Sequence, residues 1–178
     1  MDQLFSLVQS ALIVAFLFAV VYAMVLDFNT ARIPNWLTVP VALGFLPTAL
    51  LAGLTPREIF AEHYGTGVLV LLGGALLFAR GWIGGGDAKF LTAVGIWAGW
   101  KGLPDYLLVT AIGSGVLALM TLIVRAPVGV QLTTWMPFLD RGFGGGEKVP
   151  LGVAIGAGGL YLLHRLDVVP KGWLPLFQ

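Results

Sequence analysis

The sequence predicts an all-α membrane protein: a bundle of about six transmembrane helices in a single domain over residues 1–178. Of its 178 residues, 58% are hydrophobic and only 11% are charged, whereas a soluble domain usually carries about 25% charged residues. The mean hydropathy is +0.91. Long uncharged stretches recur along the chain, and such stretches are typical of helices that cross a bilayer. The length leaves little room for a separate soluble domain.

The first two helices are expected from Leu4 to Leu26 and from Trp36 to Leu54. The first stretch is about long enough to cross a bilayer, and no Lys or Arg precedes it. Both features favour a permanent helix over a cleaved signal peptide. The second contains Pro40 and Pro47, which membrane helices tolerate where neighbours satisfy the freed carbonyl groups.

The third and fourth helices are expected from Gly65 to Ala79 and from Ala88 to Trp100, after a polar connection from Thr55 to about Tyr64. Both are shorter than the roughly 20 residues of a full crossing. They flank a glycine-rich turn, which suggests that the turn dips toward the bilayer or that the membrane is locally thin.

The fifth helix, from Asp105 to Val124, follows a break at Gly102-Leu103-Pro104, and the sixth, from Val149 to Leu163, is again short. The longest connection, Arg125 to Lys148, lies between them. Its apolar residues fit a segment along the membrane interface, but an ordinary loop with a few apolar anchors fits equally well.

Composition excludes several functional classes. Cysteine is absent, so no thiol nucleophile or cysteine zinc site is expected. His63 and His164 lack the spacing of metal ligands, and we expect no metal and no cofactor. The net charge is +1 without a basic run, which argues against nucleic acid as a partner. The lipid bilayer is the expected partner.

Orientation is predicted from the basic residues, because cytoplasmic loops carry an excess of Lys and Arg. With the N-terminus outside, the inner loops hold Arg32, Arg80, Lys89, Arg125, Arg141 and Lys148, and the outer side holds Arg57, Lys101, Arg165 and Lys171. This bias is modest, but it puts Asp27 and Asp87 on one face, the cytoplasmic one.

Two aspartates are the leading candidates for function. Asp27 ends the first apolar stretch, and Asp87 sits between two uncharged stretches. A carboxylate so close to hydrocarbon is costly, and its default interpretation is functional. The simpler alternative is structural, because aspartate is also a favoured residue at helix ends.

The glycines before Asp87 support the functional interpretation. A turn needs one glycine, whereas Gly84, Gly85 and Gly86 together let another chain approach the backbone closely, as a peptide substrate pairing with its N–H and C=O groups requires. A similar run precedes Glu147, which makes Glu147 a rival for the second carboxylate.

Two carboxylates in one site can act as an acid and a base. They cannot both ionise, so one keeps its proton while the other accepts a proton from water. The activated water then attacks a carbonyl carbon, and the protonated carboxyl polarises that carbonyl. Cysteine is absent and the histidines fall on the opposite expected face, which argues against Cys/His or Ser/His catalysis.

At this point a resemblance becomes specific. Asp27 followed by Ile33-Pro34-Asn35, and then Gly84-x-Gly86-Asp87 with Ala88-Lys89, resembles the type IV prepilin peptidases, the Gly-x-Gly-Asp intramembrane aspartyl proteases. The run from Val149 to Ile155, with Pro150, resembles the start of the family's last helix. The motifs occur in the family's order over nearly the whole chain.

The resemblance implies cleavage of prepilin or pseudopilin leader peptides at the cytoplasmic face of the inner membrane. It implies that Asp27 and Asp87 form the catalytic pair, with Asn35, Lys89 and Pro150 as possible supporting residues and the pilus-assembly machinery as a possible partner.

The chain is similar to the short branch that serves tight-adherence (Flp) pili, although archaeal preflagellin peptidases share the same core. Longer members insert a cysteine-rich zinc domain between the first two helices and also N-methylate the pilin. Only eight residues separate Asp27 from Trp36 here, so methyltransferase activity is not expected.

Two other functions remain open from the sequence. A small transporter or channel uses membrane acids as ion or proton relays. Against this possibility, both acids of this chain lie at the ends of expected helices rather than in mid-span. A pilus-assembly scaffold without catalysis is the third possibility, and it predicts that Asp87→Asn leaves substrate processing intact.

Overall fold

The computed structural model describes residues 2–126, 134–136, 143, 149–165 and 168–169. These residues form helices and no strands, which confirms the all-α prediction. The elements are α1 (Asp2–Thr30), α2 (Asn35–Leu51), the π-helical η1 (Glu58–Tyr64), α3 (Gly65–Ala79), α4 (Gly85–Arg125), α7 (Leu151–Tyr161) and the short 3-10 helix η3 (Leu162–Arg165).

In the described part of the chain, three helices are long and apolar enough to cross a membrane: Gln3–Thr30, Glu58–Ala79 and Gly85–Arg125. The helices α2 and α7 are apolar but shorter. The structure therefore agrees with a helical membrane protein, while the expected count of six crossings is not confirmed. The Arg125–Lys148 connection and Glu147 fall largely or wholly outside the described residues.

The third span is longer than expected, because the polar connection up to Tyr64 is mostly helical. Glu58 accepts hydrogen bonds at 2.7 Å from both the backbone N–H and the hydroxyl of Thr55, and its own N–H donates to that hydroxyl at 3.3 Å. This is a reciprocal capping box, with Pro56 at a position where proline is favoured. The cap starts η1, which continues directly into α3.

The expected fourth and fifth spans are the two halves of α4, and the break between them is three residues earlier than expected. It lies at Gly99, with φ 60° and ψ −177°, and Pro104 sits inside the second half. Only glycine adopts this backbone conformation readily. The buried ring of His63 fills the space beside it: a Cβ at position 99 would lie 2.8 Å from Cε1 of His63.

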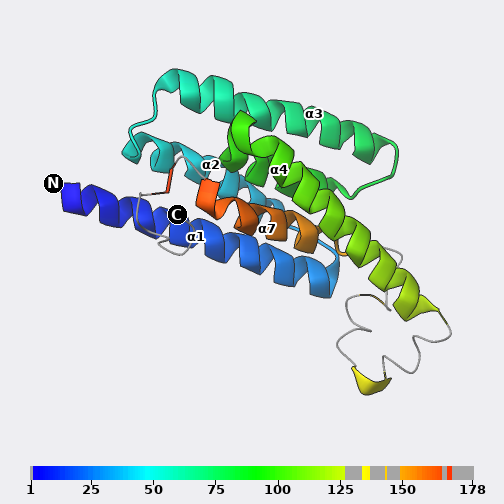
Figure 1. Cartoon of the computed structure of the whole chain (residues 1–178). Coiled ribbons are helices and arrows are strands. Elements are labelled where there is room, and N and C mark those ends of the chain that lie inside the picture. The colour runs from blue at the N-terminus through cyan, green and yellow to red at the C-terminus, as the bar shows by residue number, and fades with distance from the viewer. Residues whose placement is uncertain (1, 127–133, 137–142, 144–148, 166–167, 170–178) are drawn as a thin grey trace.

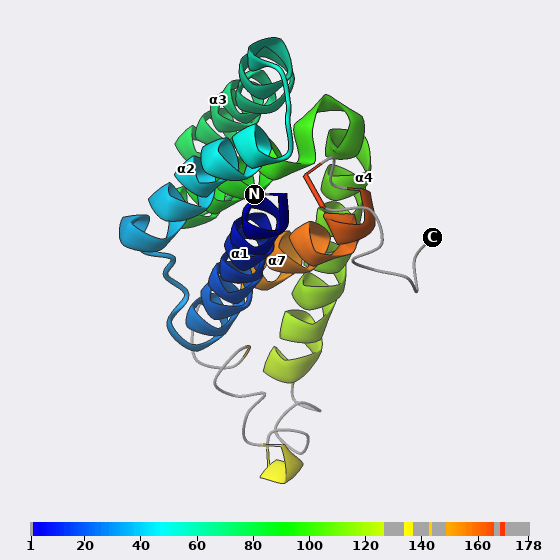
Figure 2. The same cartoon turned by 90° about the vertical axis from the view of Figure 1, so that its left-hand side faces the viewer.

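The two halves of α4 join the other helices into one bundle. The helices α2, α3 and α7 all pack on α4, and α7 lies between α1 and α4, as both views show (Figures 1 and 2). Trp97 of α4 anchors the core, stacked on Phe16 with ring centroids 4.0 Å apart, and its indole N–H donates to the carbonyl of Val41 at 2.8 Å. The core thus holds α1, α2 and α4 in register.

Replacing Gly99 by alanine is expected to destabilise the bundle by about 2 kcal/mol, because the new Cβ adds backbone strain and meets His63. The measurement is thermal unfolding of the two proteins in the same detergent. Gly115→Ala in the second half of α4 is the matched control, since a Cβ there meets nothing within 4 Å. An unchanged unfolding temperature for Gly99→Ala contradicts the break at Gly99.

Candidate active site

Asp27 lies in the last turn of α1 and is buried, with 3% of its surface exposed. Its Oδ2 accepts a hydrogen bond of 2.6 Å from the backbone N–H of Gly152, the second residue of α7. The first N–H groups of a helix lack partners within the helix and carry partial positive charge. The carboxylate of Asp27 therefore joins the end of α1 to the start of α7.

This contact depends on glycine at position 152. A Cβ there would lie 2.8 Å from both Cβ and Cγ of Asp27 and 2.7 Å from Cδ1 of Ile33. Real Cβ atoms do not approach other atoms so closely. The absence of a side chain at Gly152 lets Asp27 reach the helix terminus.

Asp87 lies in the first turn of α4 and is half-buried. Its Oδ2 accepts a hydrogen bond of 3.2 Å from the backbone N–H of Gly84, the N-cap residue. Asp87 therefore helps to cap α4, which agrees with the simpler interpretation of this residue as a helix-end aspartate. It does so from the third position of the helix rather than from the N-cap. A capping carboxylate at the edge of a cavity can also act chemically, so this role excludes neither interpretation.

The link between α1 and α2 brings the two aspartate-bearing segments together. Ala31, with a left-handed φ of 49°, follows the end of α1 and turns the chain. Ile33 then packs against the starts of α4 and α7: a Cβ at Gly86 would lie 3.1 Å from the Ile33 carbonyl oxygen, and a Cβ at Gly152 would meet its Cδ1. Ile33 is buried. Asp27, through Gly152, and Asp87, through its neighbour Gly86, thus lie at the same end of the bundle, near Ile33.

The glycine run allows this close approach, but the neighbour is the chain itself. At Gly86 the neighbour is the backbone of Ile33, while the ring of Phe78 lies against Gly85, 3.3 Å from where a Cβ would be. Gly84 is the N-cap of α4. The expected role of the three glycines in approaching a substrate remains a proposal.

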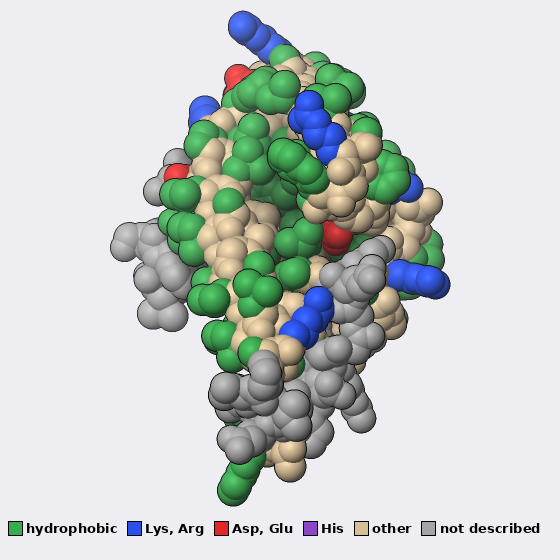
Figure 3. All heavy atoms as spheres, turned by 90° about the vertical axis from the view of Figure 1, so that its right-hand side faces the viewer, with side chains coloured by type: hydrophobic (Ala, Val, Ile, Leu, Met, Phe, Trp, Pro, Cys, Tyr) green, Lys and Arg blue, Asp and Glu red, His purple; other side chains and the backbone are tan. Residues whose placement is uncertain are grey.

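Within the described part of the chain, two cavities border Asp87. One, of about 380 Å³, is lined by residues 31–35 and 84–87. The other, of about 500 Å³, is lined by Phe78, Gly81, Trp82, Ile83, Gly84, Gly85, Asp87, Ala118, Val149 and Leu151. Figure 3 looks onto this end of the molecule, where an acidic side chain is visible within a mainly apolar surface. The two cavities leave space beside Asp87 that is large enough for water.

The structure also places the residues that were expected to support the site. The Lys89 ammonium donates a 3.0 Å hydrogen bond to Oδ1 of Asn35, so these two residues meet and tie the start of α2 to the first turn of α4. Pro150 is buried and is the N-cap of α7, next to the Asp27 contact.

The described residues contain no group of three His, Cys, Asp or Glu side chains that could hold a metal ion. His63, the one histidine whose side chain is described, is bonded through Nδ1 to the Ile96 carbonyl at 2.8 Å. Its tautomer therefore carries the proton on Nδ1, because a carbonyl oxygen only accepts. His63 serves the break in α4 rather than the aspartate end.

Sequence reasoning missed two residues of the site. Gly152 was noted only as a member of the run from Val149 to Ile155, and Ile33 only as part of the Ile33-Pro34-Asn35 motif. A signal for Gly152 was its place directly after Pro150-Leu151, at a helix start, where exposed N–H groups attract carboxylates.

Fold and site define a helical protein with membrane-length apolar helices and two aspartates at one end of its bundle. Comparison with family models is more specific. The model of the type IV leader peptidase family matches residues 13–123, and the chain belongs to this family. The matched region contains Asp27, Asn35, the glycine run, Asp87 and Lys89. Pro150 and Gly152 lie beyond it.

Curated relatives agree with the family. The chain is 34% identical over 111 residues to the prepilin leader peptidase/N-methyltransferase of Escherichia coli K12, covering 60% of this chain and 49% of that protein. Proteins of the same name from Aeromonas salmonicida and Dickeya chrysanthemi are 31% and 32% identical, over 56% and 49% of this chain and 36% and 32% of their own lengths. The match thus spans half or less of each relative. No solved structure matches the chain significantly.

Proposed function

We propose that the chain is an intramembrane aspartic endopeptidase that removes leader peptides from type IV prepilins, with Asp27 and Asp87 as the reacting carboxylates. The observation that carries the proposal is the meeting of three helix ends at Ile33: it packs against Gly86, next to Asp87, and against Gly152, whose N–H binds Asp27. Membership of the type IV leader peptidase family and the names of the relatives support the substrate class.

The proposed reaction needs one ionised and one protonated carboxyl group. The ionised carboxylate takes a proton from water, and the resulting hydroxide attacks the carbonyl carbon of the scissile peptide bond. The protonated carboxyl donates a hydrogen bond to the carbonyl oxygen and stabilises the charge that develops there. The C–N bond then breaks, and a carboxyl proton passes to the leaving amine. The cavities beside Asp87 supply the path for water.

We further infer that the protein serves pili of the tight-adherence type and does not methylate its product. The relatives are named as N-methyltransferases as well as peptidases. In this chain α1 ends at Thr30 and α2 begins at Asn35, so the link holds four residues and no inserted domain. Mass spectrometry of the processed pilin tests this point, because a product heavier by one methyl group contradicts it.

The test of peptidase activity is co-expression with a type IV prepilin, followed by comparison of leader removal for the wild type, Asp27→Asn, Asp87→Asn and Glu147→Gln. Loss of cleavage in the two Asp variants alone supports the proposal. Loss in Glu147→Gln with activity in Asp27→Asn assigns the second carboxylate to Glu147. A wild-type protein that cleaves no prepilin overturns the proposed activity.

The aspartate end is expected to face the cytoplasm of a cell whose inner membrane holds the protein. Among the described residues, Arg32, Arg80, Lys89 and Arg125 flank the helix ends on this side, and Arg57 and Lys101 flank the opposite ends. A reporter fused after Trp82, in the turn between α3 and α4, should therefore give a cytoplasmic signal, with a fusion after Gly53 as the periplasmic control. The reverse pattern contradicts the orientation.

A further inference from the structure

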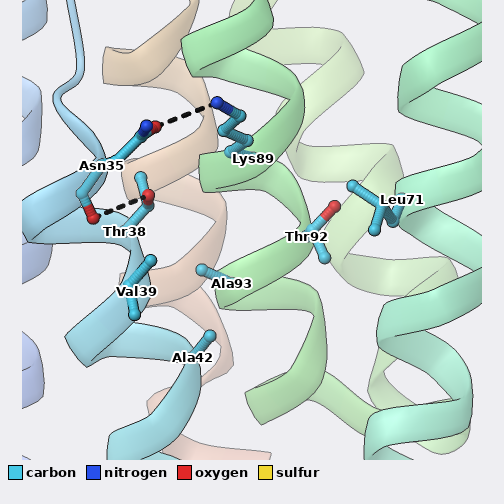
Figure 4. A pocket seen from close by; sticks show the side chains of 8 residues that line it. All are labelled: Asn35, Thr38, Val39, Ala42, Leu71, Lys89, Thr92 and Ala93. Carbon is cyan, nitrogen blue, oxygen red and sulfur yellow. Dashed lines mark hydrogen bonds between the residues drawn. The ribbon is translucent and has the colours of Figure 1, made fainter.

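A groove runs between α2 and α3 over a floor formed by α4. It has a volume of about 270 Å³ and is lined by Asn35, Thr38, Val39, Ala42, Leu71, Lys89, Thr92 and Ala93. Figure 4 shows α4 between its two neighbours, with Val39 and Ala42 of α2 on one side and Leu71 of α3 on the other. The groove stays open because α2 and α3 pack on α4 and touch each other little in the described part of the chain.

The groove begins at the candidate active site. Asn35 lines both the groove and the 380 Å³ cavity that borders Asp87. From Asn35 to Ala42 the lining follows α2 for seven residues, which is about 10 Å along the helix axis. The groove therefore leads from the Asp87 cavity along the helices, away from the aspartate end of the bundle.

A polar pair separates the two compartments. Lys89 and Asn35 form their 3.0 Å hydrogen bond at the mouth of the groove (Figure 4). A lysine at the end of a membrane helix keeps its ammonium at the headgroup level. Below this pair the lining side chains are aliphatic or threonine, and the Thr92 hydroxyl is satisfied by the Ala88 carbonyl at 2.9 Å. The groove thus presents an apolar surface at membrane depth.

We propose that this groove receives the apolar helix of a membrane-anchored substrate and positions the scissile bond of that substrate at Asp87; the proposal rests on the proposed peptidase function. A polypeptide against an apolar surface in the bilayer must satisfy its own backbone groups, so it must be helical there. A helix is 10–12 Å wide with side chains, and the small volume admits one face of it. Beyond the Asn35–Lys89 pair the substrate can unwind into the Asp87 cavity, where water satisfies its backbone.

The first experiment fills the groove with Ala42→Phe and compares two substrates: a membrane-anchored prepilin and a short peptide that spans the same cleavage site without the apolar helix. Ala42 contributes its backbone carbonyl to Tyr64 at 3.1 Å, a bond that the substitution leaves in place. We expect kcat/KM for the anchored substrate to fall about tenfold, equivalent to ~1.4 kcal/mol, mainly through KM, and kcat/KM for the peptide to stay unchanged.

The control is Leu43→Phe, the neighbouring residue on α2, which is 60% exposed and does not line the groove. It should cleave both substrates as the wild type does. Equal cleavage of the anchored substrate by Ala42→Phe and the wild type overturns the groove assignment. Loss of both substrates in Ala42→Phe also overturns it, because the residue then supports the fold or the chemistry. A wild type that cleaves neither substrate refutes the peptidase function instead.

The second experiment locates the substrate directly. The chain has no cysteine, so Val39→Cys, on the 51% exposed rim of the groove, introduces a single thiol. In the Asp87→Asn background, which leaves the substrate uncut, disulfide cross-links to single cysteines along the substrate helix should recur every three to four residues. Leu43→Cys should cross-link weakly. Equal cross-linking from both positions shows that the substrate does not select the groove and overturns the proposal. Cleavage that depends on lipid composition rather than on Ala42→Phe indicates that a lipid fills the groove and also overturns it.

Discussion

Asp27→Asn and Asp87→Asn are each expected to lower the rate of prepilin cleavage by about 10³-fold, within the range that general acid–base catalysis contributes. An amide can neither take the proton from water nor donate a carboxyl proton to the leaving amine. The two losses should not add in the double variant, because the carboxyl groups act as one unit. The measurement is the initial rate with a purified prepilin at equal concentrations of folded protein.

The fold should survive both substitutions. Asparagine is nearly isosteric with aspartate, and its side-chain carbonyl can still accept the hydrogen bonds that Gly152 donates to Asp27 and that Gly84 donates to Asp87. Unfolding temperatures close to that of the wild type are therefore expected. Glu62→Gln at the opposite end is the matched control and should cleave at the wild-type rate. Full activity in either Asp variant removes that residue from the proposed pair.

The sequence was sufficient to predict the apolar helices, because hydrocarbon demands long uncharged segments whatever the tertiary structure. The third helix was expected from Gly65 to Ala79, and α3 has these bounds. The helix η1 before it was missed, although Thr55 and Glu58 form a recognisable capping box. Its polar and charged residues resemble a loop in composition, and the capping contacts are what make it helical.

The break in α4 shows where sequence reasoning fails for a physical reason. Gly99, Gly102 and Pro104 all disfavour a regular helix. Local propensity alone places the break at Gly102 and Pro104, which lie close together. The structure breaks at Gly99 because the buried His63 ring occupies the space beside it and bonds the Ile96 carbonyl one turn earlier. The position of the break is therefore set by His63, a residue far from Gly99 in the sequence.

In the site, too, features that depend on local sequence were predictable and features that depend on distant contacts were not. Asp27 and Asp87 were recognisable because a charge beside hydrocarbon is costly, and this argument needs only the local sequence. The helix start at Gly152 was recognisable as a place that attracts a carboxylate, but its pairing with Asp27 was not, because the hydrogen bond joins residues 125 positions apart. Packing of Ile33 against Gly86 and Gly152 likewise depends on how three helix ends meet. That Asp27 and Asp87 react as a pair remains a prediction.

Gly152→Ala is expected to lower kcat/KM for prepilin cleavage by about 100-fold, because it displaces a reacting group without removing it. The new Cβ would lie 2.8 Å from Cβ and Cγ of Asp27, so the carboxylate must move and lose its 2.6 Å hydrogen bond to the α7 terminus. A misplacement of about 1 Å in a reacting group costs a factor of this size. The crowding should also lower stability by about 1–3 kcal/mol.

Gly73→Ala in α3 is the control, since a Cβ there meets nothing within 4 Å; it should retain full activity. A second comparison identifies whether crowding of Asp27 or of Ile33 by the new Cβ causes the loss of activity. The Cβ at position 152 also meets Cδ1 of Ile33, and Ile33→Val removes that atom. If displacement of Asp27 causes the loss, Gly152→Ala combined with Ile33→Val stays inactive while regaining stability. Restored cleavage in the combined variant traces the loss to Ile33, and then the Asp27–Gly152 contact is not what positions the carboxylate for catalysis.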